Sequence, residues 1–213
     1  MERQFTPIDR FISAVDQALR LSTGVTPTVA RANPAGQLAE SEMDEQTRRH
    51  VAGLMRVNHS GEICAQALYA GQAATARNLG VRAEMEKASQ EEIDHLSWCG
   101  QRLEELDSHT SLLNPLWYAG SFAIGAVAGL AGDGWSLGFL KETEIQVEAH
   151  LEDHIGRLPE GDRRSQAILD QMKTDEAKHA EMASAAGAFE LPQPVKQAMT
   201  FASRIMKAVA YRI

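Results

Sequence analysis

The pattern of apolar and polar positions predicts helices along almost the whole chain. Residues 7–20 place apolar side chains at 8, 11, 12, 15, 18 and 19, the one-sided stripe of an amphipathic helix. A linker rich in proline, glycine and small polar residues follows at 22–36. Four long helical patterns then cover 44–80, 81–107, 135–158 and 161–190, with Asp162 as a predicted N-cap. The Gly/Ala-rich apolar stretch 116–134 and the amphipathic tail 195–213 complete the series. With no convincing strand, the chain is predicted to be all-α.

Composition narrows the class of protein only slightly. The 213 residues are enough for one domain with a sizeable core. A formal net charge of −8 argues against a nucleic-acid partner, which would require a basic face. The two cysteines, Cys64 and Cys99, form no CxxC motif, and no secretory signal is present. We therefore expect a reducing, cytoplasmic compartment, with both thiols filling the core.

Charge is distributed unevenly along this acidic chain. Residues 109–132 contain no Asp, Glu, Lys or Arg. The last 19 residues carry four basic side chains and no acid: Lys196, Arg204, Lys207 and Arg212. A basic, apolar tail on an acidic protein is typical of a chain that lies on a surface such as a membrane.

Two short motifs of the same form suggest metal binding. Glu92 and His95 are three residues apart in "QEEIDHLSW", so on a helix they project from one face. Glu176 and His179 repeat this spacing in "TDEAKHAEM". Each pair also has a glutamate about 30 residues upstream on the preceding helix, Glu62 in the first case and Glu144 in the second. One ExxH is common by chance, but two with matching upstream glutamates are much rarer.

Two helical hairpins packed about a pseudo-two-fold axis would bring four glutamates and two histidines together. This is the arrangement of ferritin-like di-iron and di-manganese bundles. Four carboxylates carry four negative charges, which two divalent cations neutralise. Buried without cations, the carboxylates would cost several kcal/mol each or would have to take up protons. Oxygen and imidazole ligands without thiolate favour iron or manganese over zinc, and we expect two iron ions. The predicted metal ligands are Glu62, Glu92, His95, Glu144, Glu176 and His179.

Four further residues are candidates for supporting these ligands. Glu91 and Asp175 directly precede the ExxH glutamates, and each could accept a hydrogen bond from the histidine of the opposite half. Solvated surface acids are the alternative. Glu148 and His150 lie near Glu144 and are expected either in an outer shell or at the surface. Glu144 is the least secure ligand, because Glu142 and Glu148 lie on the same predicted helix.

These motifs resemble those of the 5-demethoxyubiquinone hydroxylases, membrane-associated di-iron monooxygenases of ubiquinone biosynthesis. The resemblance rests on "VNHSGEICAQALYAGQ", "EEIDHL", "DEAKHAEM" and the apolar "NPLWYAGSFAIGAVAGLAG". It covers about residues 47–213, which we expect to form a ferritin-like di-iron domain that includes the apolar segment 112–132 and the helix 195–213. Residues 1–46 are expected to form an amphipathic arm and a linker.

The resemblance implies the ligand grouping and the reaction. Glu62, Glu92 and His95 would serve one iron and Glu144, Glu176 and His179 the other, with Glu92 and Glu176 bridging. The enzyme would hydroxylate the ring of a polyprenyl benzoquinol with O₂, using two electrons from NADH, although no GxGxxG motif offers a nucleotide site. It further implies a peripheral, monotopic position on the cytoplasmic face of the cell membrane (the inner leaflet), with a homo-oligomer and ubiquinone-biosynthesis proteins as possible partners.

The uncharged stretch 109–132 leaves about 17 helical residues between Pro115 and Asp133, the short limit for a membrane span. Ser121, Gly125 and Gly129 repeat at i+4 and would allow a helix or ligand to approach closely. We expect an interfacial or channel-lining helix; a buried core helix or a dimer interface is the alternative.

Three other functions remain open from the residues alone. An iron store of the ferritin type normally has a poorer second site than this chain. A peroxide-handling protein of the rubrerythrin type would normally carry an additional Cys₄ iron site, and no tyrosine stands one or two turns beyond Glu92. A non-enzymatic membrane adaptor would leave the Glu and His side chains at the surface.

Overall fold

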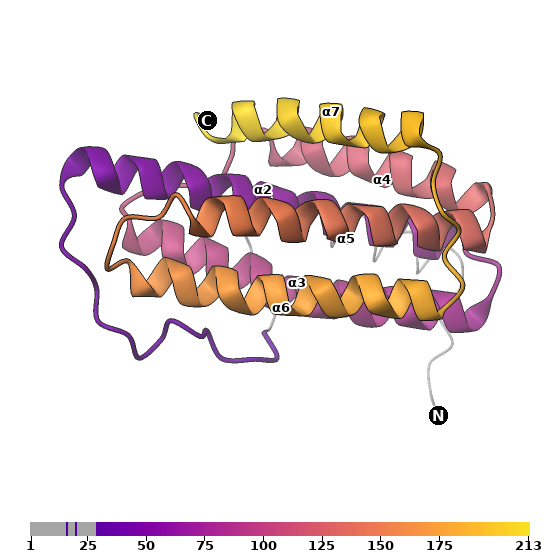
Figure 1. The fold of residues 1–213 in the computed structure, drawn as a ribbon, viewed down its shortest axis with the longest axis horizontal. Helices are drawn as coiled ribbons and strands as arrows, with labels where there is room; N and C mark the ends of the chain where they lie inside the picture. The colour runs from indigo at the N-terminus through magenta and orange to yellow at the C-terminus, as the bar shows by residue number, and fades with distance from the viewer. Residues whose placement is uncertain (1–15, 17–19, 21–28) are drawn as a thin grey trace.

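The computed structural model describes Asp16, Arg20 and residues 29–213, apart from the side chains of Glu84 and Glu86. Within these residues the chain forms six helices and no strand, as expected for an all-α protein. The helices are α2 (Glu45–Thr75), α3 (Leu79–Glu105), α4 (Asn114–Leu130), α5 (Asp133–Ile155), α6 (Arg163–Ala185) and α7 (Gln193–Ala210) (Figure 1). The helix predicted at 7–20 lies outside the described residues except for Asp16 and Arg20, which are helical and form an ion pair at 2.8 Å.

Four of the helices form a bundle made of two hairpins. Helix α2 packs along α3 and α5 packs along α6, while contacts of α3 with α6 and of α2 with α5 join the hairpins (Figure 1). Helices α4 and α7 lie on one side of this bundle, with α4 packed on α2 and α7 packed on α2 and α5. The four long helices plus accessory helices therefore match the expectation.

Polar caps determine where the bundle helices begin. The Asp44 carboxylate accepts a hydrogen bond from the Thr47 amide, and the Asp162 carboxylate accepts one from Ser165, which confirms Asp162 as an N-cap. The predicted first helix was too long, because Ala76 and Asn78 are extended and the Asn78 side chain caps α3. The predicted 161–190 helix ends early, at Ala185, and Gly187 follows with φ 96°.

Two apolar clusters fill the bundle on either side of a polar layer. One contains Met55, Trp98, Leu151, Ile168 and Met172, and the other contains Tyr69, Met85, Leu137, Leu140 and Ala183. Cys99 is fully buried in the first cluster, as predicted, whereas Cys64 is only partly buried.

Helix α4 lies unusually close to α2. A Cβ atom added at Gly125 would lie 2.3 Å from the Leu68 carbonyl oxygen, and one at Gly71 would lie 2.3 Å from the Phe122 carbonyl oxygen. The small residues therefore permit backbone-to-backbone contact, as their spacing indicated. The opposite face of α4 exposes Leu116 and Val127, so the alternative of a fully buried core helix is wrong. No helix in the described part of the chain is both long and apolar enough to cross a membrane.

Gly125→Ala is expected to destabilise the protein by about 1–3 kcal/mol, because the new methyl group would push α4 away from the backbone of α2. Gly120→Ala is the matched control on the same helix: a Cβ there meets nothing within 4 Å. It should leave the stability unchanged or raise it by up to about 1 kcal/mol through helix propensity. Urea unfolding of both variants measures the difference, and equal stabilities would show that α4 can shift without cost.

Candidate metal centre

The structure brings all six predicted ligand side chains together in the polar layer of the bundle. Each helix of the bundle contributes: Glu62 from α2, Glu92 and His95 from α3, Glu144 from α5, and Glu176 and His179 from α6. None of the six is more than 4% exposed. The interpretation of these residues as surface groups of an adaptor is therefore wrong.

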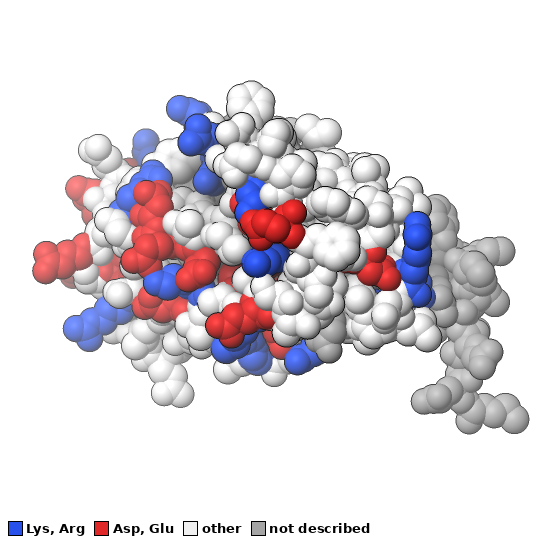
Figure 2. Space-filling model, turned by 45° about the vertical axis from the view of Figure 1, so that its right-hand side comes forward, with Lys and Arg blue, Asp and Glu red and all other residues white. Residues whose placement is uncertain are grey.

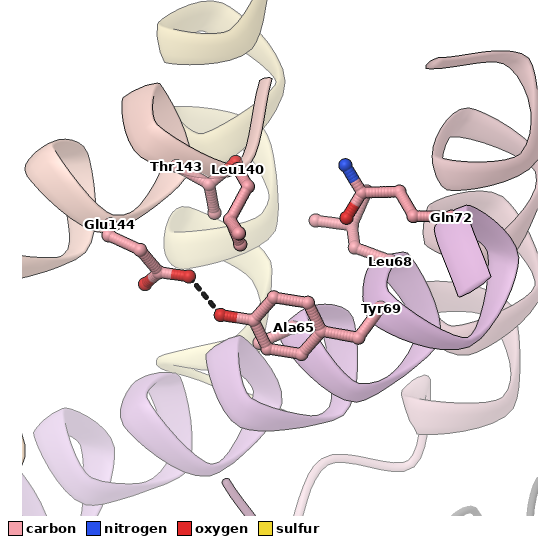
Figure 3. A pocket seen from close by; sticks show the side chains of 7 residues that line it. All are labelled: Ala65, Leu68, Tyr69, Gln72, Leu140, Thr143 and Glu144. Carbon is pink, nitrogen blue, oxygen red and sulfur yellow. Dashed lines mark hydrogen bonds between the residues drawn. The ribbon is translucent and has the colours of Figure 1, made fainter. Parts of the chain in front are cut away.

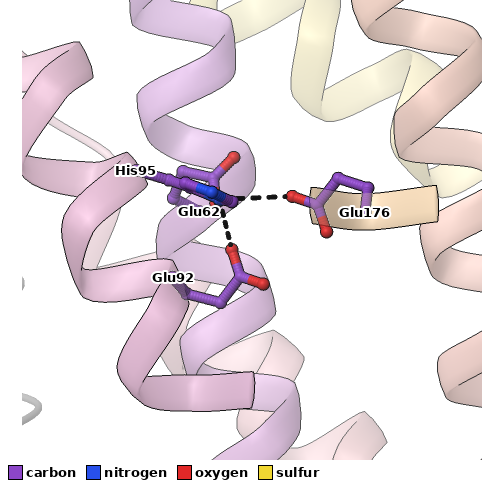
Figure 4. A group of neighbouring side chains, drawn as sticks. All are labelled: Glu62, Glu92, His95 and Glu176. Atoms are coloured by element: carbon purple, nitrogen blue, oxygen red, sulfur yellow. Dashed lines mark hydrogen bonds and ion pairs between the residues drawn. The ribbon is translucent and has the colours of Figure 1, made fainter. Parts of the chain in front are cut away.

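The six side chains form two overlapping groups. In each group, one candidate ligand atom from every member lies within 4.8 Å of those of the others; the groups are Glu62, Glu92, His95, Glu176 and Glu92, Glu144, Glu176, His179. The first group is shown in Figure 4, where the carboxylates of Glu62, Glu92 and Glu176 converge on His95. The two groups share Glu92 and Glu176.

The shared glutamates each face both histidines. The two carboxylate oxygens of Glu92 lie 3.1 Å from His95 Nδ1 and 3.2 Å from His179 Nδ1. Those of Glu176 lie 3.4 Å and 3.2 Å from the same two nitrogens. Glu62 approaches only His95, at 3.6 Å. A carboxylate that offers one oxygen to each half of the site has the geometry of a bridge between two cations.

Burial and mutual repulsion strongly perturb the protonation of the cluster. Burial and the neighbouring Glu92 carboxylate hold the pKa of Glu62 well above its usual range, and burial and the Glu176 carboxylate do the same for Glu144. Burial opposes protonation of His179, but the hydrogen bonds that it donates to Glu176 and Glu92 raise its pKa to about 12. Without cations the cluster therefore holds protons in their place, which two divalent cations would displace on binding.

The outward-facing nitrogen of each histidine meets an acid of the other hairpin. His95 Nε2 lies 3.2 Å from Asp175 Oδ2, and His179 Nε2 lies 2.7 Å from Glu91 Oε2. These are the contacts expected from the sequence. Each acid fixes its histidine so that Nδ1 points into the cluster, which is the usual role of such partners around a metal site.

An arginine from the N-terminal linker supports one of the two histidines. The Arg31 guanidinium donates to Asp94 at 2.8 Å and to Asp175 at 2.6 Å, and its centre lies 5.0 Å from the centre of the Trp98 ring. Its third nitrogen lies 3.4 Å from His95 Nε2. Burial opposes the charged form of Asp175, but hydrogen bonds from His95 and Arg31 hold its pKa well below its usual range. The linker is thereby joined directly to the candidate metal centre.

The other half of the centre is bounded by a tyrosine and a pocket. The buried Tyr69 hydroxyl donates a hydrogen bond to the Glu144 carboxylate (Figure 3). Both residues line a small, closed pocket between α2 and α5, which has no room for a water molecule; the other lining residues are Ala65, Leu68, Gln72, Leu140 and Thr143. Glu144 itself is only 1% exposed, so the packed side chains of this pocket cover it.

The residues present fit two cations. Glu62 Oε2 is buried, and its nearest histidine nitrogen, His95 Nδ1, lies 3.6 Å away, beyond hydrogen-bond distance. Unpartnered buried carboxylate oxygens are costly unless a cation or proton occupies the space beside them. The donor set of carboxylate oxygen and imidazole nitrogen, without thiolate, suits iron or manganese.

Several neighbouring candidates lie outside the cluster. Glu142 pairs with Lys196 at 2.9 Å, so it does not compete with Glu144 for the ligand position. His150 Nε2 faces the Asn58 side chain at 3.1 Å, and its ring lies against His154. Glu148 is half-buried and makes no hydrogen bond or ion pair with the six residues in the described structure. The structure therefore does not bring Glu148 and His150 into the candidate centre.

Comparison with known proteins identifies the family. The model of the family described as "Ubiquinone biosynthesis protein COQ7" matches residues 49–210. The chain belongs to the COQ7 family. Its curated relatives include a 3-demethoxyubiquinol 3-hydroxylase of Xanthomonas oryzae pv. oryzae, 56% identical over 99% of this chain and 97% of the relative. The enzyme of the same name from Cupriavidus pinatubonensis is 58% identical over 97% of this chain and all of the relative.

The COQ7 family match contains every residue of the two overlapping groups but not Arg31. Sequence reasoning did not find Arg31 or Tyr69. Tyr69 is seven residues after Glu62 on α2, so its two-turn spacing from a ligand candidate was an available signal. Arg31 gives no comparable signal, because it lies in an irregular linker, 144 residues away from Asp175 in the chain.

Arg31→Gln is expected to weaken metal binding by about tenfold, because Asp175 loses its shortest ion pair and is held less firmly against His95. Arg31→Lys should recover part of the loss, since it restores the charge but not the fork that reaches both acids. Competition with a chelating dye, with Co²⁺ as the probe metal, measures the affinity. Arg49→Gln is the control, because within the described residues Arg49 forms an ion pair with the exposed Glu45 alone. Unchanged affinity in a folded Arg31→Gln protein would show that Arg31 merely attaches the linker.

Proposed function

We propose that this COQ7 family member is a di-iron monooxygenase that hydroxylates the ring of a polyprenyl demethoxybenzoquinol with O₂ in ubiquinone biosynthesis. The observation that carries the proposal is the pair of buried Glu₃His groups sharing Glu92 and Glu176. The names of the relatives support the substrate; they number the hydroxylated ring position 3, whereas the resemblance implied 5, and the difference is one of wording. The bundle is the ferritin-like arrangement expected for such a centre.

The ligand assignment follows the contacts of each carboxylate. Glu62 and His95 would hold one iron, Glu144 and His179 the other, and Glu92 and Glu176 would bridge them. When bound, the two irons supply the two-electron reduction of O₂ that ring hydroxylation requires. Asp175 and Glu91 keep the histidines oriented, and the Tyr69 hydroxyl holds a proton at the Glu144 carboxylate.

The quinol ring is proposed to approach along the pocket beside Glu144, whose side chains must move apart to admit it because the pocket is closed in this structure. It is lined by apolar groups of Ala65, Leu68 and Leu140, with the Tyr69 hydroxyl and Glu144 at its inner end (Figure 3). A flat, apolar ring with polar substituents suits such a lining. The same apolar walls exclude water from the reacting oxygen.

A membrane-facing role of α4 and α7 is also proposed, because the substrate carries a lipid tail. Both helices lie on the same side of the bundle and expose large apolar side chains, among them Leu116, Val127, Phe201 and Ile205. In Figure 2 the upper surface of the molecule is mostly white, with blue basic side chains toward one end. Apolar groups flanked by basic ones favour a monotopic position on an anionic leaflet, here the cytoplasmic face of the cell membrane. An NADH-derived electron supply, a homo-oligomer and partner proteins of ubiquinone biosynthesis belong to the same proposal.

Glu176→Gln is expected to lose the iron centre, because one bridging carboxylate oxygen is replaced by an amide that coordinates poorly. The wild-type chain should contain about two irons after anaerobic loading, counted by metal analysis, and should convert demethoxyubiquinol to its hydroxylated product. The variant should lose hydroxylation together with iron. A wild-type chain that binds no transition metal under these conditions would refute the proposal.

Thr143→Phe separates substrate access from metal binding in the same assay. Thr143 lines the pocket but is not one of the ligand candidates. The variant should retain its iron and its electronic spectrum while the KM for the quinol rises by about tenfold or more. An unchanged KM would show that the quinol does not approach through this pocket.

Phe201→Ser combined with Ile205→Ser should weaken binding to anionic vesicles by about tenfold, since two apolar anchors of α7 are removed. Vesicle flotation measures the bound fraction. Leu79→Ser is the control, because Leu79 is more exposed than either residue but belongs to α3, which is not part of the proposed membrane surface. If the control loses as much binding as the double variant, α7 is not the contact surface.

A further inference from the structure

A second cavity lies at one end of the bundle and shares no residue with the candidate metal centre. It has a volume of about 670 Å³ and is open to solvent. Three segments form its wall: the first turns of α2, the connection from α3 to α4, and the residues that follow α7. In Figure 1 this is the end at which the indigo start of α2 and the C-terminus lie. The volume is within the range of about 300–1,000 Å³ that is usual for organic ligands.

The wall of this cavity contains a buried arginine without an acidic partner. Arg56 is only 7% exposed. Its guanidinium donates to the carbonyl oxygens of His109 at 2.8 Å and Tyr211 at 3.1 Å, and to the Ser108 hydroxyl at 2.7 Å. All three acceptors are neutral, and no carboxylate of the described residues pairs with Arg56. Two of its five N–H groups remain available.

Buried arginines are rare without a counter-ion, because burial penalises an uncompensated charge. Burial also lowers the pKa of Arg56 from its usual value, because removal from water disfavours the charged form. The carbonyl end of α7 at Tyr211 offsets about half a charge at most. The remainder is not balanced by any group of the described cavity wall.

The other charges of the wall leave the cavity positive. Arg48 pairs with Asp107 at 3.1 Å and Arg49 pairs with Glu45 at 2.8 Å, which uses both acids of the lining. Arg212, the fourth arginine, donates to the Ala208 carbonyl oxygen and has no acidic partner in the described structure. Arg56 and Arg212 therefore provide two uncompensated guanidinium groups in one cavity.

Apolar and aromatic groups complete the wall beside these two arginines. The Tyr211 ring packs flat against Gly53, where an added Cβ would lie 2.6 Å from the ring, and its hydroxyl contacts His50 Nδ1 at 2.7 Å. Leu106 and Ala52 also line the cavity. Such groups suit the organic part of a ligand, whereas the two guanidinium groups suit phosphate oxygens, to which they bind in bidentate fashion.

We propose that this cavity binds a soluble anion of the nucleoside diphosphate class, with its diphosphate at Arg56 and Arg212 and its organic part beside Tyr211. The two adjacent phosphates match the two uncompensated charges, and the volume exceeds what inorganic phosphate would fill. The site is separate from the metal ligands, so the inference does not depend on the proposed hydroxylase function. A phospholipid headgroup shares the phosphate chemistry and is the competing source.

The test measures binding of ADP, adenosine and inorganic pyrophosphate to the full chain at constant ionic strength by equilibrium dialysis. ADP should bind saturably and at least tenfold more tightly than adenosine, and pyrophosphate should compete with it. Arg212→Gln, at an exposed position, should weaken ADP binding by at least tenfold. Arg204→Gln is the matched control, because Arg204 is an exposed arginine of α7 that does not line the cavity. The Glu176→Gln variant should bind ADP like the wild type, which distinguishes this site from the metal centre.

Arg56→Gln and Arg56→Lys test the buried cation directly. The first should abolish ADP binding and the second should retain part of it; if Arg56→Gln does not fold, Arg56→Lys and Arg212→Gln decide. Absence of saturable ADP binding at millimolar concentration, or equal losses in Arg204→Gln and Arg212→Gln, overturns the proposal. A lipid headgroup is the ligand instead if ADP fails to bind and Arg212→Gln reduces binding to phosphatidylglycerol vesicles while Arg204→Gln does not. That result also overturns the proposal.

Discussion

The repulsion among four buried glutamates is the constraint on which the rest of this structure depends. Carboxylates within a few ångströms of one another inside a helix bundle cannot all remain charged without compensation. The charges of the glutamates can be compensated by the two histidines and bound protons, or by two divalent cations. The hairpins must then align closely, because each shared glutamate has to face the histidine of both halves. The rigid apolar clusters on either side of the polar layer provide that alignment.

The local part of this arrangement could be predicted from the sequence. Helical patterns predicted α2, α3, α5, α6 and α7, and the apolar stretch 116–134 indicated α4. The i, i+3 spacing placed each histidine beside its glutamate. The contacts of Glu91 and Asp175 with the opposite histidines also followed, because a pseudo-two-fold bundle relates the two ExxH motifs. In each case the inference needed only helix geometry and one symmetry relation.

Features that depend on irregular or distant segments could not be predicted in the same way. The contact of Arg31 with Asp94 and Asp175 joins a linker without periodicity to two bundle helices. The small residues of 116–134 indicated a close approach, but they did not name α2 as the partner. The break between α2 and α3 was predicted between residues 80 and 81, but it lies at 76–78, because Asn78 is equally compatible with a helix interior and with a cap.

Asp175 and Glu91, the acids that contact the two histidines, differ in the number of hydrogen bonds that hold them. Asp175 accepts hydrogen bonds from Arg31, Gln171 and Lys178 in addition to its contact with His95. Glu91 has a side chain that is 37% exposed, and the described structure gives it only His179. Water can therefore compete with His179 for Glu91, which would let the His179 ring rotate, whereas Asp175 keeps the His95 ring in place. A metal ion bound by His179 would then exchange with solvent faster than one bound by His95.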